Sequence, residues 1–146
     1  SMPDSAEERI ENLRNIMNNS KQKGIIEKDI FIDPLIFPIS VSSSYGNDAL
    51  NAISMIQEIW PEVNITGGMS NVSFGLPKRR LINDVFISLA IDKGANSGII
   101  NPVESKIDRI LNIDKTTEAF DITRSMLEGN DEFCVSYLKA FREKRI

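Results

Sequence analysis

Three short apolar segments at a regular spacing limit the folds open to this chain more than any other feature of its sequence. They begin near residues 30, 63 and 97, about 33 residues apart. Residues 30–32 are wholly apolar, which is typical of a strand buried on both faces of a parallel sheet, and we expect all three segments to be strands of this buried type. Each run ends in polar residues or glycine, and ligands bind at the carboxyl ends of the strands in parallel α/β folds. The sequence therefore predicts an α/β protein with a ligand site at one end of its sheet.

Helical patterns fill most of the remaining chain. The first helix is predicted to begin at the cap residue Asp4 and to stop near Gly24. A (β/α)8 barrel needs roughly 250 residues, so 146 residues are too few to close one. We expect one partial domain over residues 1–146, with about three βα units followed by terminal helices. The other predicted helices cover residues 46–59, 78–92, 104–112, 116–127 and 131–144.

Composition excludes several classes of function. Hydrophobic residues make up 41% of the chain, which allows a buried core, and the net charge of -4 argues against a nucleic-acid partner. The apolar runs are too short to cross a bilayer, so no membrane partner is expected. Cys134, the single cysteine, is predicted to be a packed thiol and suits a reducing, cytoplasmic compartment. The absence of histidine removes Ser-His-Asp and Cys-His sites and histidine-ligated metals.

The segment from residue 66 to residue 77 has the composition of a ligand loop. It joins a predicted strand to a predicted helix, and its glycines permit close approach of a ligand to the backbone. Asn71, in the middle of the loop, offers a donor and an acceptor, although asparagine is also a common turn former. Ser70 and Ser73 flank Asn71 and could either cap the next helix or bind a ligand.

Asp33 and Asn101 stand at the ends of the first and third predicted strands. Pro34 holds Asp33 in an extended conformation, where its carboxylate can accept two hydrogen bonds from an amidine-like edge. The alternative is an aspartate that closes a turn or pairs with a cation. Asn101 could face the same site as Asp33 and Asn71, or it could start a turn before Pro102.

The basic turn Lys78-Arg79-Arg80 opposes the dipole of the helix that it begins. Each such cation costs roughly 0.3–1 kcal/mol. An anionic ligand at the same helix end would offset this cost. A solvated basic turn with acidic residues nearby is the other interpretation, and the sequence does not decide between them.

Two sequence runs in this order resemble one protein family. Residues 32–38 and 70–77, followed by Arg79 and residues 81–83, are similar to the methyltetrahydrofolate–corrinoid methyltransferases, which include the pterin-binding module of cobalamin-dependent methionine synthase. The resemblance implies the C-terminal part of a pterin-binding (β/α)8 TIM barrel, with strands six to eight and their helices.

The resemblance also implies roles for individual residues. Asp33 would hydrogen-bond the pterin ring, and Asn71 would lie beside N5 as the catalytic amide. Ser70, Ser73, Arg79 and Asn101 would complete the substrate-binding set. Phe74 replaces a glutamine of some relatives, which removes a polar contact. Asn101 replaces an aspartate of many relatives, which removes a charge-dependent role.

The reaction implied is methyl transfer from N5 of methyltetrahydrofolate, or of a related methyl-tetrahydropterin, to the cobalt of a corrinoid protein. The cobalamin would be carried by that partner, so no metal site is expected in this chain. A second expected partner is either another copy of the chain or the N-terminal half of the barrel. A non-catalytic pterin-binding or oligomerisation module is the alternative, and a dihydropteroate synthase-like enzyme fits less well because residues 70–77 are not its signature.

Overall fold

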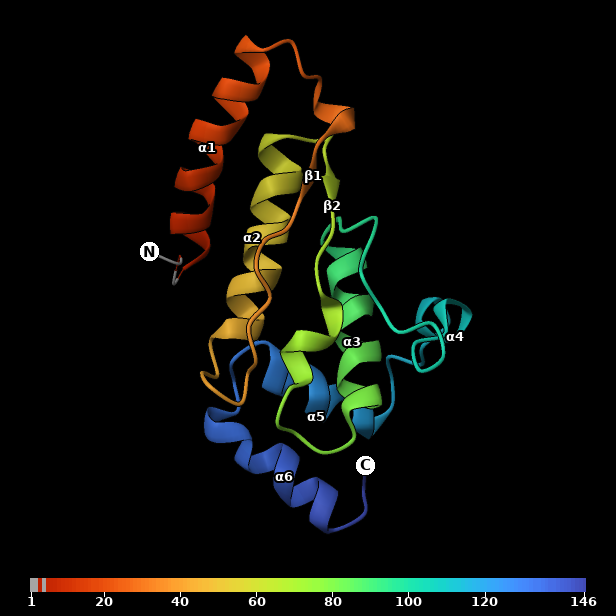
Figure 1. Cartoon of the computed structure of the whole chain (residues 1–146). Helices are drawn as coiled ribbons and strands as arrows, with labels where there is room; N and C mark the ends of the chain where they lie inside the picture. The colour runs from red at the N-terminus through yellow and green to blue at the C-terminus, as the bar shows by residue number, and fades with distance from the viewer. Residues whose placement is uncertain (1–2, 4) are drawn as a thin grey trace.

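The predicted βα units lie side by side in the computed structural model, which describes residue 3 and residues 5–146 (Figure 1). Strand β1 (Phe31–Ile32) pairs in parallel with β2 (Asn64–Ile65). The third predicted strand is reduced to a parallel bridge between Gly68 and Ile99. The order of the segments in the sheet therefore follows their order in the chain, as expected of successive βα units.

The expectation that the strands are buried on both faces is wrong. Ile32 is 3% exposed, whereas the neighbouring Phe31 is 63% exposed and Ile99 is 71% exposed. Successive side chains of a strand point to opposite faces, so the two faces of this sheet differ in environment. Helix α2 (Tyr45–Ile59) packs against β2 on the face of the buried Ile32 and Ile65, whereas on the opposite face the described residues leave Phe31 and Ile99 exposed.

Helix α1 (Ala6–Gln22) packs against α2 (Tyr45–Ile59). The side chain of Ser5 caps α1 by accepting a hydrogen bond from the Glu8 amide at 3.2 Å. The predicted cap, Asp4, lies outside the described residues. As the spacing predicted, α1 buries Ala6, Ile10 and Met17.

Helix α3 (Arg79–Asp92) follows the ligand loop and supplies a large part of the core. Its residues Ile82, Val85 and Phe86 are fully buried. Gly94 ends the helix region with a positive φ of 112°, which favours glycine. A Cβ at Gly94 would also lie 2.7 Å from Cγ of Gln57, so the glycine allows α2 and α3 to approach each other.

The C-terminal helices are shorter than predicted. Their bounds are α4 (Ile107–Leu111), α5 (Glu118–Leu127) and α6 (Val135–Arg142). The predicted helix over residues 131–144 is interrupted because Phe133 and Cys134 have positive φ values of 54° and 56°. A 3-10 turn (Glu132–Cys134) therefore precedes α6.

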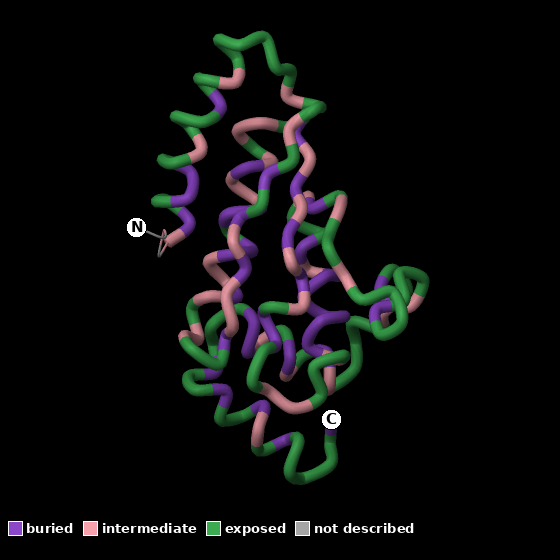
Figure 2. The backbone as a smooth tube through the Cα atoms, in the orientation of Figure 1, coloured by how far each residue is buried: buried purple, intermediate pink, exposed green. Residues whose placement is uncertain are grey.

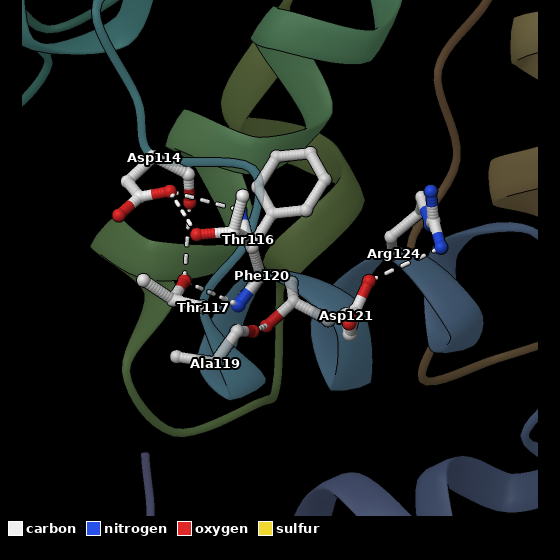
Figure 3. Close-up of polar contacts among 8 residues, drawn as sticks. Asp114, Thr116, Thr117, Ala119, Phe120, Asp121 and Arg124 are labelled. Carbon is white, nitrogen blue, oxygen red and sulfur yellow. Dashed lines mark hydrogen bonds and ion pairs between the residues drawn. The ribbon is translucent and has the colours of Figure 1, made fainter.

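Local hydrogen bonds fix the start of α5 (Figure 3). The hydroxyl of Thr117 accepts from the Phe120 amide at 3.2 Å, and Asp114 accepts from the hydroxyl and the amide of Thr116 at 2.6 and 2.9 Å. These two bonds from Thr116 lower the pKa of Asp114 below its ordinary value.

One hydrophobic cluster connects the helices to the covered face of the sheet, and its buried residues run from Ile10 to Ile146 (Figure 2). Cys134 belongs to this cluster and is 2% exposed, which confirms the prediction of a packed thiol. Burial raises the pKa of that thiol, and the nearby Asp131 adds to the effect. Among the described residues, no helix has the length and apolar character needed to span a membrane.

Candidate functional site

Asp33 and Asn71 line one pocket at the carboxyl ends of β1 and β2. The pocket has a volume of about 360 Å³. The two segments that bear these residues start from adjacent parallel strands, which brings them together although they are far apart in the sequence. The remaining lining residues are Leu35, Ile36, Phe37, Pro38, Gly68 and Phe74. The pocket therefore combines apolar walls with two polar side chains.

One oxygen of the Asp33 carboxylate is hydrogen-bonded within its own loop. Its Oδ1 accepts from the Leu35 amide at 2.9 Å, and Leu35 has a positive φ of 62°. Among the described residues, none donates a hydrogen bond to Oδ2. Gly67 lies against this carboxylate, since a Cβ there would be 3.2 Å from Oδ1. Asp33 thus closes a turn and keeps one oxygen available, so the two interpretations from the sequence are compatible.

The carboxamide of Asn71 is exposed at the pocket. Asn71 belongs to a 3-10 helix, η2 (Met69–Ser73), in which the backbone N–H of Asn71 donates to the Gly68 carbonyl at 3.0 Å. Within the described part of the chain, neither side-chain atom Oδ1 nor Nδ2 has a hydrogen-bond partner. Gly68 makes room for this amide, because a Cβ on Gly68 would lie 3.1 Å from Nδ2. Both a donor and an acceptor can therefore reach a ligand.

Three other predicted site residues support the loop and do not line the pocket. Arg79 donates to the Ser70 carbonyl at 2.9 Å and to the Ser73 hydroxyl at 3.0 Å. Ser73 is fully buried, and its hydroxyl donates to the Ser70 carbonyl at 3.1 Å. Direct contact of these residues with a substrate remains a prediction from the sequence.

Asn101 lies in a turn outside the pocket. Its Oδ1 accepts from the Val103 amide at 3.0 Å, and its carbonyl accepts from the Ser105 amide at 2.8 Å. This geometry matches the turn interpretation. Any contact between Asn101 and a ligand remains a prediction.

Several residues that shape the site were given no individual role in the sequence analysis. Phe37 forms one aromatic wall of the pocket. The centres of the Phe37 and Tyr45 rings lie 5.2 Å apart, and the guanidinium carbon of the buried Arg9 lies 5.5 Å from the centre of the Phe37 ring. The Ser40 hydroxyl donates to the Phe74 carbonyl at 2.6 Å and so joins the two loops. The run of residues 34–38, apolar despite following a strand, was the available signal for this wall.

Helix α6 holds the end of the ligand loop. The hydroxyl of the fully buried Tyr137 donates to the Pro77 carbonyl at 3.1 Å. Burial raises the pKa of Tyr137, with a smaller contribution from Cys134, so the hydroxyl stays protonated as a donor. Asp131 fixes the start of α6 by accepting from the Ser136 and Tyr137 amides at 2.8 and 2.9 Å.

A parallel βα arrangement with a pocket of apolar walls and a few polar groups at its strand ends is the setting in which α/β enzymes bind small-molecule ligands. Comparison with known proteins agrees, because residues 2–101 match the family described as pterin binding enzyme. The chain belongs to this family.

Two curated relatives carry related names. The chain is 31% identical over 145 residues to a methylcorrinoid:tetrahydrofolate methyltransferase of Eubacterium limosum, which covers 99% of this chain and 50% of the relative. It is 31% identical over 104 residues to the methionine synthase of Mycobacterium tuberculosis, which covers 66% of this chain and 9% of the relative. The chain therefore spans about half the length of the first relative and a small part of the second.

Proposed function

We propose that this chain supplies the pterin-binding face of a methyltransferase that moves a methyl group between N5 of a tetrahydrofolate-type pterin and a corrinoid protein. The observation that carries the proposal is the shared pocket of Asp33 and Asn71, each with free hydrogen-bonding capacity. Family membership and the names of the two relatives support the reaction class.

Asp33 would bind and orient the pterin. A tetrahydropterin ring presents two N–H donors on its amidine-like edge, and the free Oδ2 of Asp33 can accept from that edge. Charge-assisted hydrogen bonds of this kind are stronger than neutral ones. The apolar walls at Phe37 and Phe74 would cover the faces of the ring and exclude water.

Asn71 would act at N5. Methyl transfer breaks or forms the bond between N5 and the methyl carbon, and N5 carries positive character when the methyl group is in transit. The corrinoid on the partner protein supplies or accepts the methyl group. A neutral amide can donate to N5 or, after rotation, accept from it, and it does not titrate itself. Its dipole would stabilise the charge that develops on N5.

The proposed mechanism allows methyl transfer in either direction. The sequence suggested methyltetrahydrofolate as the donor, whereas the Eubacterium limosum relative is named for methylcorrinoid and tetrahydrofolate. The same charged N5 occurs on the reaction path in either direction, so the role of Asn71 is unchanged. We propose a reversible transfer whose net direction depends on the reactants.

The open face of the sheet supports the proposal that another structural element must pack against it to complete the site. Phe31 and Ile99 are large apolar side chains exposed on this face, and parallel sheets are normally covered on both sides. We propose that the other strands of a barrel cover this face and complete the site. A non-catalytic module that associates through the same surface is the second candidate, and it predicts assembly without pterin binding.

The proposal is tested by titrating the chain, assembled with the remaining strands of the barrel, with tetrahydrofolate in a calorimeter. Asp33→Asn should weaken binding by about tenfold, because loss of a charged hydrogen bond costs about 1.5 kcal/mol or more. Asp29→Asn is the matched control, since Asp29 is an exposed carboxylate on the segment that precedes β1. Equal affinity of the two variants would contradict the assignment of Asp33.

A further inference from the structure

A buried arginine connects helix α1 to the segment that carries Asp33. Arg9 is only 3% exposed, and its Nη2 donates to the Leu35 carbonyl at 3.3 Å. Its guanidinium carbon lies 5.5 Å from the centre of the Phe37 ring. We propose that Arg9 is a positioning residue, which fixes residues 33–38 so that Asp33 and Phe37 meet the pterin in one orientation. This inference rests on the proposed function, because it assigns how that site is held.

The backbone at Leu35 explains why such a support is needed. Leu35 has a positive φ of 62°, a conformation that is costly for a residue other than glycine and persists only where the surrounding structure holds it. The Leu35 N–H donates to Oδ1 of Asp33 at 2.9 Å, and the Leu35 carbonyl accepts from Arg9. The same residue is therefore held on one side by the proposed ligand-binding carboxylate and on the other by the arginine. Loss of the arginine would release Leu35 and, with it, the orientation of the Asp33 carboxylate.

Arg9 also supports the aromatic wall of the pocket. A cation over the face of an aromatic ring is attracted by the ring, and the attraction is stronger where the cation is removed from water, as it is here. The Tyr45 ring lies 5.2 Å from that of Phe37, so Phe37 is contacted from both α1 and α2. Phe37 and Asp33 line the same pocket. One arginine thus restrains two of the lining residues.

Both contacts depend on the shape of the arginine side chain. A planar guanidinium can stack on a ring and donate to a carbonyl at the same time, whereas a lysine ammonium is a compact point charge. Arg9→Met keeps an apolar stem and removes both the charge and the donors. Arg14 lies on the same helix and is exposed, so Arg14→Met is the matched control for loss of an arginine from α1.

The restraint can be measured without any ligand. Hydrogen exchange of the backbone amides of residues 35–39 should be on the order of tenfold faster in Arg9→Met than in the unaltered chain. Arg9→Lys should give a smaller increase and serves if Arg9→Met does not fold, and Arg14→Met should give none.

Met17→Ala controls for a general loss of stability, because it removes a buried apolar side chain of α1. It should leave exchange at residues 35–39 unchanged. Unchanged exchange in the folded Arg9 variants, or equal acceleration by Met17→Ala, would overturn the proposal.

A double-mutant cycle tests whether Arg9 acts through Asp33. The chain is assembled with the remaining strands of the barrel, and tetrahydrofolate affinity is compared among the unaltered chain, Arg9→Met, Asp33→Asn and the double variant. Arg9→Met should weaken binding about fivefold alone and less than about twofold when residue 33 is already asparagine. Equal losses in the two backgrounds would overturn the proposal. If the unaltered assembly binds no tetrahydrofolate, the proposed function fails, and the exchange measurement still decides whether Arg9 restrains residues 33–38.

Discussion

Replacing Gly68 with alanine should weaken pterin binding while the fold keeps its stability. Gly68 has φ -75° and ψ 79°, a backbone conformation that alanine can adopt. The new Cβ would lie 3.1 Å from Nδ2 of Asn71, so the exposed amide must move by a few tenths of an ångström. A neutral hydrogen bond contributes about 0.5–1.5 kcal/mol, and impairing it should raise the Kd for tetrahydrofolate by about twofold to tenfold.

Gly24→Ala is the control for this substitution. Gly24 has a φ of 75°, and a Cβ at this position would meet nothing within 4 Å. Gly24→Ala should lower the free energy of unfolding by about 1–2 kcal/mol and leave the Kd unchanged. Gly68→Ala should change the free energy of unfolding by less than about 1 kcal/mol. Urea denaturation and calorimetric titration measure the two quantities, and a Gly68→Ala variant that binds tetrahydrofolate normally would refute a hydrogen bond from Asn71 to the bound pterin.

Three further predictions concern the end of the ligand loop, the start of α5 and the open face of the sheet. Tyr137→Phe leaves the Pro77 carbonyl without its donor and should cost about 1 kcal/mol in urea denaturation. Asp114 has a lowered pKa in the fold, so its stabilising effect is present above the ordinary pKa of an aspartate and is lost as the pH falls through the folded value. Asp114→Asn should therefore flatten the loss of stability below about pH 4, and an unchanged slope would contradict the link to Thr116. Phe31→Lys should alter the unfolding free energy by less than about 0.5 kcal/mol but weaken association with a partner in sedimentation experiments, since Phe31 lies on the open face.

The sequence predicted the order of the βα units because strand and helix patterns alternate along the chain at a period of about 33 residues. It also predicted that Asp33 and Asn71 lie together, since both follow strands at the same phase of the repeat, and the pocket contains both. It failed on Phe31 and Ile99, because an apolar run does not reveal whether a second layer covers the sheet.

The sequence did not show which polar residues line the pocket and which support the ligand loop from behind. Arg79 and Ser73 are polar residues of the loop region, and nothing in their spacing shows that the buried Ser73 hydroxyl accepts a hydrogen bond from the Arg79 guanidinium. Positive φ values at Phe133 and Cys134, which interrupt the last predicted helix, depend on tertiary packing as well. The Cys134 thiol lies 4.0 Å from the Ile39 carbonyl, a contact between residues far apart in the chain.

The most direct test of the proposed reaction is the rate of methyl transfer once the remaining strands of the barrel are supplied with this chain. The absorbance of the corrinoid on its carrier protein follows the transfer in either direction. The account predicts transfer with the unaltered chain and a rate lower by about a hundredfold or more with Asn71→Ala, since one preorganised donor contributes on the order of 2.7–4 kcal/mol to the barrier. The Kd for the pterin should change much less than the rate, because the amide acts on charge that develops during transfer. An assembly that transfers methyl groups equally fast with alanine at position 71 would contradict the account.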